Sequence, residues 1–269
     1  MEIIFLFLLI LFFLSWGSFL NVVAYRLAFD KPFFTKRSYC PKCTEMIAWY
    51  DNIPVVSWIL LRGKCRVCKK PISLIYPGIE LLTAVVMTGL FFKIKNQLMM
   101  HDLGETTIIS NCNWLFWSYF IFFTGLIVST AMDFQALVVS QLCTLWLIPV
   151  GFLVSFLEIT PLAWTDSLLG AFFGYGILWV VGFVFKKVTG KEGMGIGDME
   201  LLAMIGSFAG PWGVWASLMV GSILGVLYGA MYLMITKKGR ETRIPFGPFL
   251  SFGAILYILF QATFMRFFG

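Results

Sequence analysis

The sequence predicts an all-α polytopic membrane protein with about eight transmembrane helices and one small polar insert, on three observations. Of 269 residues, 59% are hydrophobic and only 13% are charged, about half the charge of a soluble domain. Uncharged runs near the length of a membrane span recur along the chain, and about 20 apolar residues cross a hydrocarbon core. The 20 Lys and Arg residues are concentrated in a few loops.

The spans follow one another through most of the chain. Five long uncharged runs occupy 3–25, 112–132, 134–157, 167–185 and 244–265. The first run has no basic residue before it and no small-residue cleavage site after it, so we expect a retained span and not a signal peptide.

Three further spans are less regular. The run 81–92 is short, but Glu80 and Lys93 at its ends can extend their charged groups to the interface. The run 201–236 is broken by Gly210-Pro211 and predicts two spans, one beginning within 195–200.

The charge distribution predicts the orientation. Ten Lys and Arg lie between Arg26 and Lys70, three within 186–191 and four within 237–243, whereas the alternate loops hold three. The positive-inside rule puts the rich side in the cytoplasm and both termini outside. Beside a bilayer, such basic segments indicate topology and contact with anionic lipid, so we expect no nucleic-acid partner.

The insert, residues 26–77, contains two pairs of cysteines. Cys40 and Cys43 form one CxxC pair and Cys65 and Cys68 the other, separated by 21 residues. Four thiolates at this spacing can surround Zn²⁺ and close a structural site. Two disulfides or idle thiols are the alternatives, and a reducing cytoplasm disfavours disulfides. We therefore expect a zinc-ribbon-like insert.

Two other features of the cysteines and the insert are less specific. Cys112 and Cys143 lie in apolar runs and are expected to be packing residues. The segment 49–58 mixes aromatic residues with a turn-forming Asp-Asn and a Pro. The residues alone favour packing within the insert over a binding surface, and leave both open.

Two carboxylates predict the chemistry. Asp133 lies between two apolar runs, and Asp198 ends the glycine-rich sequence 193–198. An acid in a membrane segment is a functional hypothesis, and both lie at predicted cytoplasmic ends of spans. Such a pair can share a proton and activate a water molecule against a peptide carbonyl. Alone, either could instead cap a helix.

Other residues offer weaker alternatives. The glycine-rich turn could cradle a phosphate, but the Lys of a P-loop is missing. Glu80 and Glu200 are expected to face lipid headgroups or pair with Lys. His101 is the only histidine and is predicted outside, which excludes Ser-His or multi-His chemistry on the cytoplasmic side.

Several motifs in order resemble the bacterial type IV prepilin peptidases. They are Gly17-Ser-Phe-Leu-Asn-Val-Val-Ala-Tyr-Arg-Leu27, the two CxxC pairs, Trp49-Tyr-Asp-Asn-Ile-Pro54, Tyr76-Pro-Gly-Ile-Glu-Leu-Leu-Thr83, the GxGD sequence Gly193-Met-Gly-Ile-Gly-Asp198 and Ile244-Pro-Phe-Gly-Pro-Phe249. The resemblance covers nearly the whole chain.

The resemblance implies a bifunctional enzyme of the bacterial inner membrane. It would cleave the short basic leader of prepilins or pseudopilins on the cytoplasmic side, with Asp133 and Asp198 as catalytic residues. It would then methylate the new N-terminus from S-adenosylmethionine. By resemblance alone, the methyl-transfer region includes Trp49, Asp51, Asn52, Gly63 and Lys64. The implied division is a first helix (1–25), a zinc-binding insert linked to methyl transfer (26–77) and a protease bundle (78–269).

One departure and two rival functions complete the prediction. The family usually has Pro-Asp where this chain has Ser140-Gln141, which leaves Asp133 as the only acid of that region. A presenilin-like GxGD protease would lack the cysteine-rich insert. A proton-coupled transporter predicts acids near the midplane and inverted repeats, whereas these acids are expected at one face.

Overall fold

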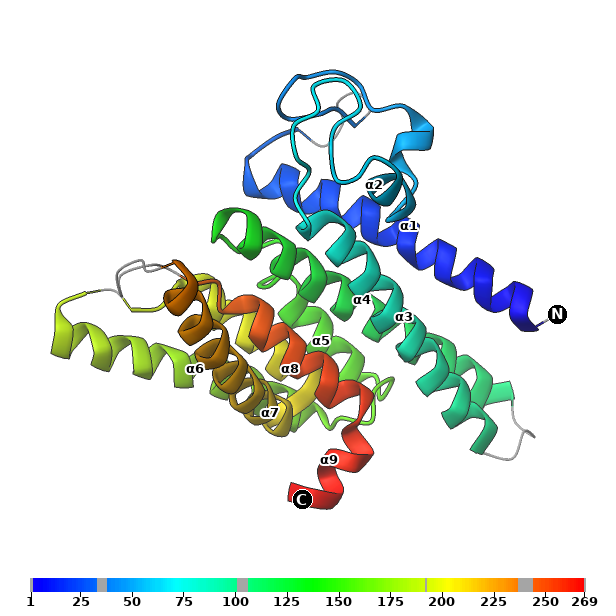
Figure 1. Cartoon of the computed structure of the whole chain (residues 1–269). Helices are drawn as coiled ribbons and strands as arrows, with labels where there is room; N and C mark the ends of the chain where they lie inside the picture. Colours follow the sequence, from blue (N-terminus) through cyan, green and yellow to red (C-terminus); the bar gives the residue numbers. More distant parts are fainter. Residues whose placement is uncertain (1, 33–37, 101–105, 192, 237–243, 269) are drawn as a thin grey trace.

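A computed structural model describes residues 2–32, 38–100, 106–191, 193–236 and 244–268. Within these ranges the chain is helical, and two isolated β-bridges are the only extended pairings. In order, the helices are α1 (Glu2–Ala28), the short 3-10 helix η1 (Trp49–Asn52), α2 (Val56–Leu60), α3 (Ile75–Met100), α4 (Thr106–Ala136), α5 (Leu147–Phe156), α6 (Trp164–Thr189), α7 (Ile196–Thr236), α8 (Gly247–Leu259) and α9 (Gln261–Phe268) (Figure 1).

The predicted all-helical fold is confirmed, but the count of eight spans is not. Five described helices are long and apolar enough to cross a bilayer: α1, α3, α4, α6 and α7. A sixth span results if α8 and α9, bent by 90° between them, count as one. The predicted fourth span, 134–157, contains the last three residues of α4 and the ten-residue helix α5, because the chain is irregular from Leu137 to Trp146.

The predicted sixth and seventh spans both lie in α7, which consists of two helices that meet at a kink. It begins at Ile196, inside the stretch predicted for a helix start, and runs for 41 residues. Gly210, with φ 68° and ψ −173°, interrupts the helical backbone immediately before Pro211. A positive φ is accessible to glycine at little cost, and proline cannot donate a hydrogen bond to the preceding turn. The predicted break at Gly210-Pro211 is therefore present. Leu201 before it and Gly221 after it both pack against the first turns of α8, so the second helix runs back alongside the first.

Close glycine contacts hold α6 against the first half of α7. Gly170 meets Gly206, and Gly174 meets the backbone at Leu202, so that a Cβ at any of these glycines would collide with the partner helix. Small residues at four-residue spacing let helix backbones approach within a membrane. The Ser167 hydroxyl adds a hydrogen bond of 2.7 Å to the Ser207 carbonyl. This crossing fixes the helix that carries Asp198.

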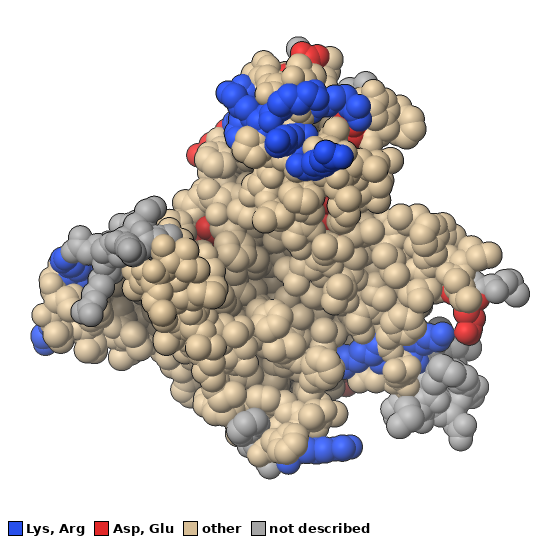
Figure 2. All heavy atoms as spheres, in the orientation of Figure 1, with Lys and Arg blue, Asp and Glu red and all other residues tan. Residues whose placement is uncertain are grey.

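The insert rests on the ends of α1 and α3. The chain enters it from the C-terminal end of α1 and leaves it at the start of α3, and Figure 1 shows it covering that end of the bundle. Since α4 runs back alongside α3, its C-terminal end returns to the insert's side. In Figure 2 the Lys and Arg side chains gather over the insert, while most of the visible bundle is uncharged.

Candidate functional site

Asp133 lies in the last turn of α4, where α8 begins. Its side chain is buried, with 6% exposed. The backbone N–H of Gly247, the first residue of α8, donates to Asp133 Oδ2 at 3.0 Å. The first N–H groups of a helix have no partner within it and favour an anion. The start of α8 therefore stabilises a carboxylate that the C-terminal end of α4 would disfavour.

Asp198 lies in the first turn of α7 and faces the same region. Gly197 packs against Val139, in the irregular segment that follows α4, and a Cβ at Gly197 would come within 2.9 Å of Val139 Cβ. The Asp198 and Asp133 carboxylates are close enough to interact electrostatically. The structure thus brings the two predicted catalytic residues together from α4 and α7.

A pair of facing carboxylates has a specific chemical capacity. Two carboxylates that come close together cannot both ionise easily, so such a pair can share one proton. One carboxylate can then take a proton from water while the other donates a proton to a carbonyl oxygen. Asp198 is less buried than Asp133, so a substrate can approach from its side.

Glu200 is buried next to this pair, contrary to the expectation that it faces headgroups or pairs with Lys. Only 6% of it is exposed. Gln141 Nε2 donates to Glu200 Oε1 at 3.2 Å, and the Thr144 hydroxyl donates to Oε2 at 3.1 Å. Glu200 thereby ties the irregular segment after α4 to the first turn of α7. His101, the predicted outside histidine, lies outside the described residues.

The insert contains the same turn twice, 25 residues apart. The Cys40 N–H donates to the Glu45 carbonyl at 2.9 Å, and the Thr44 N–H returns to the Cys40 carbonyl at 2.8 Å. The second turn repeats both bonds between Cys65 and Lys70 and between Lys69 and Cys65, at 2.9 and 3.0 Å. Thr44 and Lys69 both have a positive φ, 59° and 56°. Each turn thus points its two thiols in the same way.

The four predicted ligands converge and fit a tetrahedral metal ion. The sulfur atoms of Cys40, Cys43, Cys65 and Cys68 all lie within 4.8 Å of one another, and Cys40 and Cys68 are 4.0 Å apart. Zinc–sulfur bonds of about 2.3 Å in a tetrahedron place sulfurs about 3.8 Å apart. Cys112 and Cys143 lie elsewhere and pack against the core, as predicted.

The thiols of this cluster differ in acidity. The pKa of Cys65 is lowered to about 7, chiefly because the Cys68 N–H donates to its sulfur. The pKa of Cys43 is raised to about 11: although the Glu45 N–H donates to its sulfur, burial and the neighbouring thiols disfavour its charge. Several thiolates at this distance need a cation between them, which a divalent metal ion supplies.

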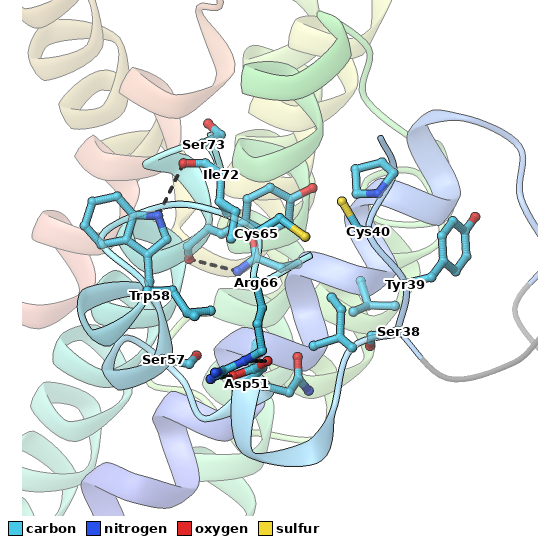
Figure 3. Close-up of a pocket in the computed structure, with 18 of the residues that line it drawn as sticks. Ser38, Tyr39, Cys40, Asp51, Ser57, Trp58, Cys65, Arg66, Ile72 and Ser73 are labelled. Atoms are coloured by element: carbon cyan, nitrogen blue, oxygen red, sulfur yellow. Dashed lines mark hydrogen bonds and ion pairs between the residues drawn. The ribbon is translucent and has the colours of Figure 1, made fainter. Parts of the chain in front are cut away.

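Beside the cysteines, the insert and the ends of α1 and α3 enclose a cavity of about 1130 Å³. Asp51 and Asn52 line it, whereas Trp49, Gly63 and Lys64, also predicted for methyl transfer, do not. Figure 3 shows Asp51 facing Arg66 across the wall of the cavity.

Two of the predicted methyl-transfer residues shape the cavity wall. Arg66 Nε and Nη2 donate to Asp51 at 2.7 and 2.6 Å, and this hydrogen-bonded ion pair lowers the pKa of Asp51. The pair joins η1 to the second cysteine turn. Gly63, with φ +66°, leaves room for the Trp58 ring, which a Cβ there would approach to 2.8 Å. The Trp58 ring lines the cavity and donates to the Ile72 carbonyl at 3.3 Å (Figure 3).

Sequence reasoning missed the residues at the base of this cavity. Ser18 and Asn21 of α1 and Glu80 of α3 all line it. Glu80 is 8% exposed, so the expectation that it faces headgroups or pairs with Lys is wrong for this residue as well. The sequence does show these polar residues in two otherwise apolar helices. It does not show that they lie close together, because that depends on how α1 and α3 pack.

Comparison with known proteins decides the family. The profile of the bacterial peptidase A24 N-terminal domain matches residues 11–94, and that of the type IV leader peptidase family matches residues 120–230. A protein of Xanthomonas campestris pv. campestris named prepilin leader peptidase/N-methyltransferase is 32% identical over 87% of this chain and 84% of its own length. This chain belongs to the type IV leader peptidase family.

Other members of the type IV leader peptidase family agree with this assignment. An Aeromonas hydrophila protein of the same name is 31% identical over 96% of this chain and 92% of its own length. An Escherichia coli relative, named type 4 prepilin-like proteins leader peptide-processing enzyme, is 32% identical over 85% of this chain and 77% of its own. No solved structure matches the chain. The region of this chain that matches the N-terminal profile contains the four cysteines, and the region that matches the peptidase profile contains both aspartates.

Proposed function

We propose that this protein removes the short basic leader of type IV prepilins or pseudopilins and then methylates the new N-terminal amine from S-adenosylmethionine. The meeting of Asp133 and Asp198 at one end of the bundle carries the proposal. Its relatives are named for both activities. The cysteine-rich insert separates it from a presenilin-like protease, and acids at the helix ends separate it from a transporter.

For leader cleavage, each aspartate has a defined task. Asp133 is held by the Gly247 N–H inside the bundle, and Asp198 lies at the more open edge. One carboxylate takes a proton from the attacking water, and its protonated partner donates to the scissile carbonyl oxygen. Gly195 has no side chain beside Asp198, where a Cβ would lie 3.7 Å from Asp198 Oδ2, so an extended peptide can come close to this carboxylate.

For methylation, the insert supplies the site. Cys40, Cys43, Cys65 and Cys68 would hold Zn²⁺ as a structural ion that orders the insert over α1 and α3. The cavity beside them is large enough for a nucleoside cofactor, with Asp51 and Asn52 on its wall. When bound there, S-adenosylmethionine supplies a methyl group on a sulfonium sulfur.

The proposed orientation places the insert and both aspartates in the cytoplasm of a bacterial inner membrane, with the N-terminus outside. The gathering of Lys and Arg over the insert supports this side. The basic stretch 237–243, which entered the sequence prediction, lies outside the described residues. The substrate helix would lie in the bilayer with its leader on the cytoplasmic side.

The test of cleavage uses membranes that contain the full chain, a prepilin and mass spectrometry of the product. We expect Asp133→Asn and Asp198→Asn each to lower the rate of leader removal by at least about 100-fold, since each removes a member of an acid–base pair. Zinc content should stay unchanged, because neither residue contacts the insert cluster. Leader removal at the wild-type rate in both variants would refute the role of the pair.

A further inference from the structure

The base of the cavity holds a buried carboxylate that forms no ion pair with a described Lys or Arg. Glu80 lines the cavity and is 8% exposed. The Val55 N–H donates to Glu80 Oε2 at 2.8 Å, and the Ser18 hydroxyl also donates to this carboxylate. Among the described residues, no Lys or Arg forms an ion pair with it. A buried carboxylate is stable when a positive group or several donors compensate its charge.

The neighbouring Asn21 offers a second unused acceptor. Asn21 is 2% exposed and lines the same cavity. Its Nδ2 donates to the Tyr76 carbonyl at 3.0 Å, and because that carbonyl requires a donor, the amide orientation is settled. Its Oδ1 is buried without a hydrogen-bond partner. Buried polar atoms are rarely left unpaired, so this oxygen points to a missing donor.

The packing of α1 on α3 brings these acceptors together. A Cβ at Gly17 would lie 2.9 Å from Glu80 Cα, so the absence of a side chain there lets the two helices approach. Asn21, one turn along α1, meets Tyr76, one turn back along α3. Groups one turn apart on a helix lie about 5–6 Å apart. Glu80 and Asn21 can therefore contact one small ligand group.

Three basic residues that line the cavity are already engaged by other groups. Arg66 pairs with Asp51, Lys42 donates to the Pro71 carbonyl at 3.1 Å, and Lys31 donates to the Tyr25 and Tyr39 hydroxyls at 3.0 and 3.4 Å. Glu80 and Asn21 Oδ1 therefore require a hydrogen-bond donor that carries positive charge. A primary ammonium has three N–H donors and one positive charge.

We propose that Glu80 and Asn21 bind the α-ammonium of the processed substrate and position this amine for methylation. The inference rests on the proposed function, since leader removal is what creates such an ammonium. Glu80 supplies the opposite charge, and Asn21 Oδ1 accepts one N–H. The bound ammonium then loses one proton to water, its nitrogen lone pair forms the N–CH3 bond as the S–CH3 bond of S-adenosylmethionine breaks, and S-adenosylhomocysteine leaves. The cationic methyl donor has the same kind of charge, and the experiment separates the two ligands.

The decisive variant is Glu80→Gln, because a glutamine oxygen still accepts from the Val55 N–H and the Ser18 hydroxyl. The contact between insert and α3 is therefore kept, and only the charge is removed. The matched control is Glu45→Gln, the same change at an exposed residue of the same cavity. A second variant, Asn21→Leu, removes the unpaired oxygen without altering charge.

The assay uses the purified full chain in detergent with zinc, a leader-free pilin peptide and S-adenosylmethionine, and measures methylated peptide by mass spectrometry. For Glu80→Gln we expect KM for the peptide to rise about 10- to 100-fold, because the peptide ammonium loses a charge-assisted hydrogen bond. In Glu80→Gln, KM for S-adenosylmethionine and the zinc content should match wild type. In Glu45→Gln, KM for the peptide and KM for S-adenosylmethionine should both match wild type. Asn21→Leu should raise the peptide KM less. An N-acetylated peptide should inhibit wild type and Glu80→Gln equally.

Other results would overturn the assignment. A rise in KM for S-adenosylmethionine alone would place the methyl donor at Glu80 instead of the peptide ammonium. An unchanged peptide KM in Glu80→Gln, or an equal rise in Glu45→Gln, would also refute it, as would loss of zinc in Glu80→Gln, which indicates a structural role. If the wild-type protein methylates no peptide at all, the proposed second activity fails, and that result is distinct from all of these.

Discussion

Gly247 contacts Asp133 through its backbone, and this contact restricts what the position can hold. A Cβ there would lie 2.9 Å from Asp133 Oδ2 and 3.3 Å from Leu201 Cδ2. Such a side chain must displace the carboxylate or separate α8 from α7. The position therefore requires glycine for space, since its φ is not among the positive values of the chain.

We expect Gly247→Ala to lower the rate of leader cleavage by about 10- to 100-fold, because a shift of about 1 Å in a catalytic group is enough for such a loss. Gly225→Ala is the control: the atoms nearest to a Cβ there belong to the Phe246 and Phe249 rings, at 3.6 Å or more, which is ordinary contact. Cleavage kinetics and thermal unfolding of both variants check this. Equal cleavage rates in the two would show that the Gly247 N–H does not position Asp133.

At the scale of elements, the segment between α4 and α5 replaces most of an expected span. Thr144 and Gln141 of this segment hold Glu200 at the start of α7. The start of α7, which carries Asp198, is thus held against the segment that follows Asp133 and α4. This link is polar and buried, so its loss is costly.

We expect Thr144→Val to destabilise the protein by about 1–3 kcal/mol, because Glu200 Oε2 loses its donor while remaining buried. Leader cleavage should fall with it, since the first turn of α7 loosens. Thr160→Val is the matched control: Thr160 is equally buried and contacts the Ser155 hydroxyl at 3.2 Å, in the turn after α5. The two variants should lose similar stability, measured by thermal unfolding. Cleavage reduced equally in both would contradict the special role of Thr144.

These elements show what the sequence could reveal. The cysteine spacing predicted the cluster because each CxxC turn is local, and the charge distribution placed Asp133 and Asp198 at one end of the bundle. The burial of Glu80 and Glu200 could not be predicted, since their partners Val55 and Thr144 are far away in sequence. The shortness of α5 could not be predicted either, because an apolar run does not show whether its backbone is helical throughout.

At the scale of the whole molecule, the two proposed reactions use separate parts of one chain. The described residues that line the cavity all lie at or before Glu80, whereas the proposed catalytic pair belongs to α4 and α7 and is supported by α8. The ends of the bundle that carry both sites lie on the insert's side. A substrate could therefore pass from cleavage to methylation without crossing the membrane.

This division predicts that metal removal separates the two activities. Without a cation, thiolates within 4.8 Å of one another repel, so we expect the two cysteine turns to part and the cavity wall to loosen. Treatment with a strong zinc chelator should abolish methylation of a leader-free peptide and leave leader cleavage within about twofold of its starting rate. The proposed catalytic aspartates lie in the helix bundle, which tertiary packing and not metal holds together. Zinc content by mass spectrometry and both product yields test this, and Cys65→Ser should reproduce the pattern with less bound zinc. Parallel loss of cleavage would show instead that the insert also shapes the catalytic pair.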